Sequence, residues 1–104
     1  MYKLIFFVPI QSAEEVKNAI FNSGGGRLGN YSHCSFETSG VGQFLPNKMA
    51  NPAIGEIGEI ERVDELKVEI LCEDIEVVKS SIQALKDSHP YEEPAYEVLT
   101  LLKI

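Results

Sequence analysis

Two stretches of the chain repeat apolar residues at the spacing of one helix face. The first stretch carries Ala13, Val16, Ala19 and Ile20, and the second carries Ile75, Val78, Ile82 and Leu85. Ser12, with Glu15 three residues later, and Asp74 are positioned to cap the two N-termini. Glycines from Gly24 onward end the first stretch, and the second ends near Ser88. The pattern therefore predicts two amphipathic helices, each of which buries one face.

The other apolar segments have the length and the alternation of β-strands. Residues 4–8 form an unbroken apolar run, which is typical of a central strand that is covered on both faces. Residues 65–72 alternate between apolar and polar positions. Their predicted buried face consists of Leu66, Val68, Ile70 and Cys72. The other face, which includes Lys67 and Glu69, is predicted to meet water.

Three more segments complete the predicted sheet. Residues 31–38 and 41–44 predict a hairpin that turns at Ser39-Gly40, and residues 95–102 predict the last strand. The resulting order is β-α-β-β-α-β. This order predicts an α+β, ferredoxin-like sandwich, with two helices on one face of an antiparallel sheet. The stretch 46–58 lies between the middle strands and is a candidate for function or subunit contact, because loops of that length are uncommon in compact domains.

Composition limits the classes of protein that fit this pattern. Residues 1–104, of which 44% are hydrophobic, are enough for a single domain with one core and too few for a second domain. The net charge of -7 repels phosphate backbones and anionic lipids, so nucleic-acid binding is excluded. No apolar run approaches the roughly 20 residues of a membrane helix, and the opening segment lacks a signal-peptide cleavage pattern. We therefore expect a cytoplasmic protein.

The two cysteines carry no recognisable chemistry. Cys34 and Cys72 each lie in a strand-like run, and neither has a second cysteine at redox or zinc-binding spacing. We expect both to be reduced thiols that point into the core from strands of one sheet.

The segment 89–94, His-Pro-Tyr-Glu-Glu-Pro, is the most distinctive part of the chain. Pro90 and Pro94 restrict the residues before them to extended backbone, which gives the segment one rigid shape. One interpretation is a structural joint between the second helix and the last strand, in which Tyr91 anchors the turn and the carboxylates accept backbone hydrogen bonds.

The other interpretation of this segment is a binding site. His89, Glu92 and Glu93 would form a cluster for a cation, a polar ligand or a neighbouring subunit, with His33 as a further contributor. An imidazole beside two carboxylates predicts weak binding of a divalent metal such as copper or zinc, which tightens as the histidine loses its proton.

A glycine-rich stretch, residues 24–29, formally matches the dinucleotide-binding pattern GxGxxG. That pattern binds pyrophosphate only where it follows a strand and opens a helix, whereas here it follows a helix. The backbone amides beside Arg27 could instead hold an anion, although a simple helix exit explains the glycines as well. Arg27, Gly29 and Tyr31, together with Tyr91, are the residues that we assign to binding of a small ligand.

The sequence contains no recognisable catalytic constellation. His33 and Cys34 are neighbours in a predicted strand, so their side chains point to opposite faces and one cannot activate the other. No HxH, HxxxH or HExxH spacing is present for a preformed metal centre. The inventory therefore favours a binding protein over an enzyme.

Four segments together resemble a known family. Residues 29–36, 40–46, 51–63 and 89–96 are similar, in order and spacing, to the domain inserted into the YqfO branch of the Nif-three-like proteins. The last of these segments is also similar to the His-Pro-Tyr-Glu segment of the CutA proteins. That likeness implies the related PII-like class of the ferredoxin-like fold, whose assemblies are typically trimers.

The resemblance leaves two functions open. In full-length family members the dinuclear metal site belongs to the flanking halves, so the chain resembles the insert standing alone. The first function is a non-enzymatic binding or regulatory module, a homo-oligomer that binds a divalent cation or small ligand at clefts between subunits. The second is an accessory subunit of a metal-dependent hydrolase, with the metal carried by a separate Nif-three-like protein.

Overall fold

The structure, a computed structural model, describes all of residues 1–104. Its elements are the strand β1 (Tyr2–Pro9), the 3-10 turn η1 (Ile10–Ser12), the helix α1 (Ala13–Asn22), the strands β2 (Phe36–Phe44) and β3 (Glu61–Cys72), the helix α2 (Ile75–Ser88) and the strand β4 (Tyr96–Thr100). The order of helices and strands confirms the predicted ferredoxin-like arrangement. No helix is long and apolar enough to span a membrane.

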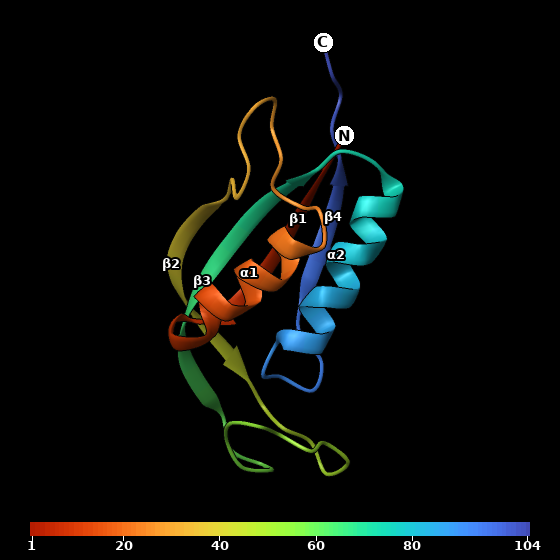
Figure 1. The fold of residues 1–104 in the computed structure, drawn as a ribbon. Coiled ribbons are helices and arrows are strands. Elements are labelled where there is room, and N and C mark those ends of the chain that lie inside the picture. Colours follow the sequence, from red (N-terminus) through yellow and green to blue (C-terminus); the bar gives the residue numbers. More distant parts are fainter.

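The four strands form one antiparallel sheet in the order β2-β3-β1-β4. Both helices pack on the same face of this sheet, and the other face has no helix over it (Figure 1). Side chains alternate between the two faces, so Phe6 meets Val68 and Tyr96 on the helix side. The fully buried side chains include Leu4, Phe6, Val8, Val16, Ile20, Val68, Ile70, Cys72 and Leu85. The core therefore lies between the helices and the central strands.

The strands β2 and β3 continue beyond the end of β1. β1 ends where Pro9 pairs with Glu65, whereas β2 and β3 remain paired as far as Phe44 and Glu61. This two-stranded arm carries the segment 45–60 at its tip, at the end of the molecule opposite to the two termini (Figure 1). The arm makes the molecule elongated, with principal extents of 46 × 24 × 24 Å.

The two helix N-termini differ in how they are capped. The Asp74 side chain accepts a hydrogen bond of 2.9 Å from the backbone N–H of Val77, which confirms Asp74 as the N-cap of α2. Ser12 occupies the N-cap position of α1, but its side chain makes no capping hydrogen bond. The 3-10 turn η1 leads directly into α1 instead, so the chain is already coiled before the helix begins.

The predicted hairpin around Ser39-Gly40 is wrong. β2 runs through these residues without a turn and pairs with β3 along its whole length. Residues 31–35 are not part of a strand, because the backbone of Cys34 is bonded to Gly26 and Tyr31 pairs with Leu28 in a tight turn. The real hairpin joins β2 to β3 through the segment 45–60.

The two cysteines also differ from each other. Cys72 is fully buried on the helix side of β3, as predicted, and its Sγ lies 3.8 Å from the Ser81 hydroxyl. Cys34 lies outside the strands and is only half-buried, so its predicted place in the core is wrong. Both thiols are free.

Candidate ligand-binding groove

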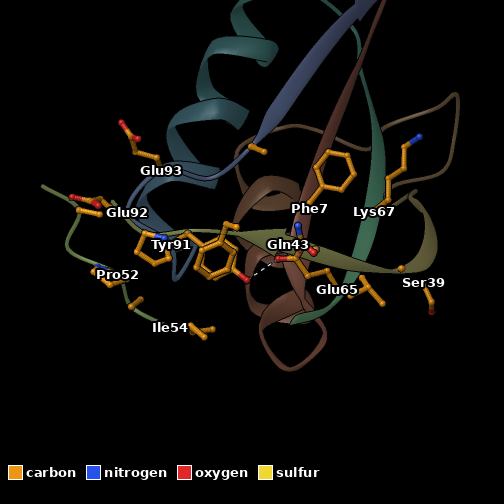
Figure 2. A pocket seen from close by; sticks show the side chains of 18 of the residues that line it. Phe7, Ser39, Gln43, Pro52, Ile54, Glu65, Lys67, Tyr91, Glu92 and Glu93 are labelled. Atoms are coloured by element: carbon orange, nitrogen blue, oxygen red, sulfur yellow. Dashed lines mark hydrogen bonds between the residues drawn. The ribbon is translucent and has the colours of Figure 1, made fainter. Parts of the chain in front are cut away.

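A groove of about 610 Å³ lies on the sheet face that carries no helix. Residues of β2 and β3, part of the segment 46–54 and the connection between α2 and β4 line it (Figure 2). In the register of the sheet, Gly40 lies opposite Glu65, and Thr38 lies opposite Lys67. These residues alternate with the helix-facing side chains of Leu66 and Val68, which places them on the open face.

His89 anchors the connection between α2 and β4 to the central strand. Its ring is buried, with 7% of the residue exposed. Nε2–H donates a hydrogen bond of 2.7 Å to the carbonyl of Phe7, and Nδ1 accepts one of 3.0 Å from the backbone N–H of Tyr91. Both ring nitrogens are therefore engaged within the chain. Burial lowers the pKa of His89 below its usual value, because it disfavours the charged imidazolium more than the Phe7 carbonyl favours it.

Tyr91, two residues after His89, reaches across the groove to β3. Its hydroxyl donates a hydrogen bond of 2.7 Å to Glu65 Oε2 (Figure 2). Its ring meets Phe44 edge-on at 5.7 Å between centroids and lies 4.9 Å from the His89 ring. Burial, together with the adjacent Glu65 carboxylate, raises the pKa of Tyr91 far above its usual value, so the hydroxyl stays protonated and remains a donor.

Glu65 is the buried acid of the groove. Only 8% of the residue is exposed, although it lines the groove. Its Oε1 lies over Gly42, where the β-carbon of any other residue would overlap the carboxylate. Glycine in the interior of a strand often marks a close approach of this kind. Gly42 thus gives the Glu65 carboxylate the room in which it accepts the bond from Tyr91.

The two remaining carboxylates of the segment 89–94 lie at the margin of the groove. Glu92 Oε1 accepts a hydrogen bond of 3.1 Å from the backbone N–H of Asn51, which ties the segment 46–54 to the connection after α2. Figure 2 shows the Glu93 side chain on the side of the groove away from Glu65. Both glutamates are exposed.

The predicted metal ligands are not brought together. His33 lies next to Phe21 at the C-terminal end of α1, with 4.9 Å between ring centroids, whereas His89 lies against Phe7. No three His, Cys, Asp or Glu side chains lie close enough to hold a metal ion. Because both nitrogens of His89 are already bonded, His89 has no free lone pair to offer a metal.

The predicted ligand-binding residues divide between two places. Tyr91 lies in the groove. Arg27, Gly29 and Tyr31 lie instead in the exposed turn after α1, near the end of the molecule that carries the termini (Figure 1). Two backbone hydrogen bonds of 2.9 Å, between Leu28 and Tyr31, close this turn.

Comparisons with known proteins agree with the geometry of the fold. A solved structure of a Bacillus cereus protein related to NIF3 superposes with a TM-score of 0.78 at 40% identity, over 96% of this chain and 25% of that one. Curated proteins named GTP cyclohydrolase 1 type 2 homolog are 41% identical in Mycobacterium tuberculosis, over 96% of this chain, and 45% identical in Bacillus subtilis, over 92%. The chain is a relative of one part of the Nif-three-like proteins. It spans about a quarter of the length of these curated relatives, 26% in both cases.

The fold alone is shared more widely. CutA1 from Pyrococcus horikoshii superposes over 100% of this chain with a TM-score of 0.68 at 17% identity. No protein-family model matches the chain. The curated and solved relatives nevertheless confirm the predicted likeness to Nif-three-like proteins, and the superposition on CutA1 confirms the predicted CutA-like fold.

Three residues of the groove in this Nif-three-like domain, Glu65, Gly42 and Phe44, are absent from the predicted site. From the sequence Glu65 is only the start of a strand, because its partner Tyr91 lies 26 residues further along the chain. One signal was available. Gly40 and Gly42 alternate within one short segment, and two glycines on the same face of a strand leave room for a neighbouring side chain or a ligand.

Proposed function

We propose that this Nif-three-like domain is a non-enzymatic binding module whose groove takes a small ligand. The observation that carries the proposal is the groove itself, lined by Tyr91, Phe44, Pro52 and Ile54 around the buried Glu65. Its volume of about 610 Å³ falls within the roughly 300–1,000 Å³ of small-molecule sites, which combine apolar walls with a few polar groups.

The polar groups of the groove support binding more than catalysis. The chain of contacts from Phe7 through His89 and Tyr91 to Glu65 is bonded internally. A general base needs a lone pair directed at the substrate, and the lone pair of His89 Nδ1 is occupied by Tyr91 N–H. These groups orient one another, and Glu65 and Tyr91 among them line the groove.

A fragment screen tests the proposal. We expect fragments to shift the backbone NMR signals of Gly40, Gly42 and Phe44 in the ¹⁵N-labelled protein. Gly40→Leu should abolish these shifts without unfolding the protein, because a β-carbon at Gly40 meets nothing within 4 Å and the side chain would fill the groove. Asn30→Leu, which places the same leucine side chain in the exposed turn, should leave them unchanged. A diverse library that shifts none of the groove signals would contradict the proposal.

We further propose that the domain works as a cytoplasmic homo-oligomer, specifically a trimer with ligand sites at its subunit clefts. The open sheet face supports this, because Phe36 is 67% exposed and Leu99 is 46% exposed on the face that carries no helix. β2 and β4 are also open edges, which invite pairing. Analytical ultracentrifugation at micromolar concentration should give three times the chain mass, and a monomer mass would contradict it.

Binding of a divalent cation by the segment 89–94 has a separate test. Calorimetric titration with copper and with zinc is compared between the wild type, His89→Ala and Glu92→Gln. A metal site at this segment requires stoichiometric, if weak, binding by the wild type that both variants reduce. Because His89 is bonded through both nitrogens, we expect the three proteins to behave alike.

The identity to proteins named GTP cyclohydrolase 1 type 2 homolog favours a second candidate function. In this case the domain is an accessory part of a metal-dependent hydrolase, with the metal site on a separate polypeptide. This chain alone should then show no GTP turnover. The rate of GTP turnover by the remaining three-quarters of the Bacillus subtilis relative should rise when this chain is added to it. An unchanged rate would leave the binding module as the function.

A further inference from the structure

Glu65 is a buried carboxylate that lacks a cationic partner. The ion pairs of the chain join Lys3, Lys17 and Lys79 to other carboxylates, and none of them includes Glu65. The hydrogen-bond donor to its side chain is the neutral Tyr91 hydroxyl. An ionised carboxylate has about four acceptor positions, and burying it is costly unless a positive charge or several donors compensate.

We propose that the groove recognises a planar organic cation, one that presents adjacent N–H donors of the amidinium or guanidinium type to Glu65. This inference rests on the proposed binding function and names the class of ligand for the same groove. Amidinium and guanidinium groups match a carboxylate in shape and charge, so they supply the donors and the positive charge that Glu65 lacks.

The aromatic residues beside Glu65 fit a planar cation as well. Tyr91 and Phe44 stand edge-on to each other and both line the groove next to the carboxylate. The face of an aromatic ring attracts a planar cation, and the attraction grows where water is displaced. Gly40 projects no side chain and has no atom within 4 Å of the position of a β-carbon, so the strand beside the carboxylate stays open to a flat group.

The charges that line the groove disfavour anionic ligands. Three carboxylates, those of Glu65, Glu92 and Glu93, line it together with one amine, that of Lys67. In Figure 2 the Lys67 side chain lies on the far side of the groove from Glu92 and Glu93. An excess of negative charge lowers the local concentration of an anion and raises that of a cation. Phosphate and carboxylate ligands are therefore disfavoured around Glu65.

Three probes of one shape test the charge preference. Benzamidine is a planar cation, benzamide is its neutral counterpart and benzoate is the anion. We expect the groove signals in the NMR spectrum to titrate with benzamidine at least tenfold more tightly than with benzamide, and not to respond to benzoate. Glu65→Gln should bring the affinities for benzamidine and benzamide within about twofold of each other, because the ion pair between amidinium and carboxylate is lost and only one of the two groups remains charged.

The matched control is Glu93→Gln, which removes the same charge from an exposed position at the margin of the groove. It should change the preference for benzamidine less than threefold. If Glu65→Gln keeps the full preference, or if Glu93→Gln loses as much of it, recognition by Glu65 is overturned. Glutamine can still accept the bond from Tyr91, so an unchanged melting temperature will show that Glu65→Gln is folded.

The outcome for the ligand class is distinguishable from that for the proposed function. If neither benzamidine nor benzamide binds while other fragments shift the groove signals, the cationic ligand is wrong and the binding module stands. If no fragment of any charge shifts these signals, the proposed function fails together with the inference. Equal affinity for benzamidine and benzamide in the wild type would also overturn the inference.

Discussion

The two ends of this domain use glycine in opposite ways. At the end near the termini, Gly25 and Gly26 are buried and let the backbone pass close to α1, Ile70 and Cys34. At the end with the groove, Gly42 instead makes room for a charged side chain from the neighbouring strand. Glycine shapes the backbone at the first end and a site at the second.

The two ends also differ in how their side chains are held. The turn after α1 is held by backbone hydrogen bonds, and its side chains at Arg27 and Tyr31 extend into solvent. In the groove, the Tyr91 hydroxyl donates to the Glu65 carboxylate of β3, and the Glu92 carboxylate accepts a bond from the backbone N–H of Asn51 in the segment after β2. A glycine-rich motif is therefore the more visible feature in the sequence, whereas the proposed binding site is a groove that the fold assembles from distant segments.

The largest expected effect comes from a glycine of the turn. Gly26 has a positive φ of 81°, and a β-carbon there would lie 2.8 Å from the Phe21 ring and 2.9 Å from the Cys34 carbonyl oxygen. Overpacking and backbone strain together should lower the free energy of unfolding of Gly26→Ala by about 2–4 kcal/mol. Urea denaturation at a fixed protein concentration measures this loss.

Gly29→Ala is the control for this prediction. Gly29 also has a positive φ, 57°, but a β-carbon added to it would meet no atom within 4 Å. The substitution should cost about 1 kcal/mol, from backbone strain alone. An equal loss in the two variants would mean that close packing at Gly26 does not matter.

The second prediction concerns the glycine of the groove. Gly42→Ala should displace the Glu65 carboxylate, break its hydrogen bond with Tyr91 and lower the free energy of unfolding by about 1–3 kcal/mol. Gly40→Ala, on the same face of the same strand, should be neutral or slightly stabilising because its β-carbon meets nothing. NMR should show the Tyr91 signals shifted in Gly42→Ala only, and the reverse pattern would contradict the assignment of Glu65.

The sequence predicts the fold correctly where side chains have one buried face. α2 and β3 show the periods of a helix and a strand because their buried positions repeat regularly. The prediction fails for β2 because most of its residues are exposed on both sides, so no apolar alternation marks the strand, and Ser39-Gly40 has the composition of a turn. An edge strand of this kind is defined by its pairing with β3, which local sequence does not encode.

The site is predictable only in part, for a similar reason. The two prolines of the segment 89–94 reveal a rigid joint, and they point to Tyr91 as its anchor. The partners of that joint, Phe7, Glu65 and Asn51, come from three other parts of the chain. Contacts between distant segments follow from the packing of the sheet and leave no local pattern.

The third prediction concerns the pH dependence of the stability that His89 contributes. The folded state lowers the pKa of His89, so the unfolded chain binds a proton more readily as the pH falls below about 6.5, the usual histidine pKa. His89 therefore contributes its full stability above that pH, and the contribution declines as the pH falls toward the pKa of the folded state. The slope is at most about 1.4 kcal/mol per pH unit for one proton.

The His89→Gln variant isolates this effect from the titration of carboxylates, because both proteins carry the same carboxylates. The difference in free energy of unfolding between the wild type and His89→Gln should shrink between about pH 6.5 and pH 5. A constant difference over this range would show that burial does not hold His89 in its neutral form.

The smallest expected effect tests whether the exposed turn has any part in binding. Arg27→Ala and Tyr31→Ser remove side chains that are exposed, 75% in the case of Tyr31, and that make no side-chain hydrogen bond or ion pair. Each should change the free energy of unfolding by less than about 0.5 kcal/mol, because surface substitutions away from structural contacts usually do. Denaturation and the benzamidine titration are run on both variants. Unchanged affinity for benzamidine would leave ligand binding at the groove beside Tyr91. A loss of affinity with an intact fold would show that the turn contributes to the site, which would require a neighbouring subunit to bring its turn to the groove.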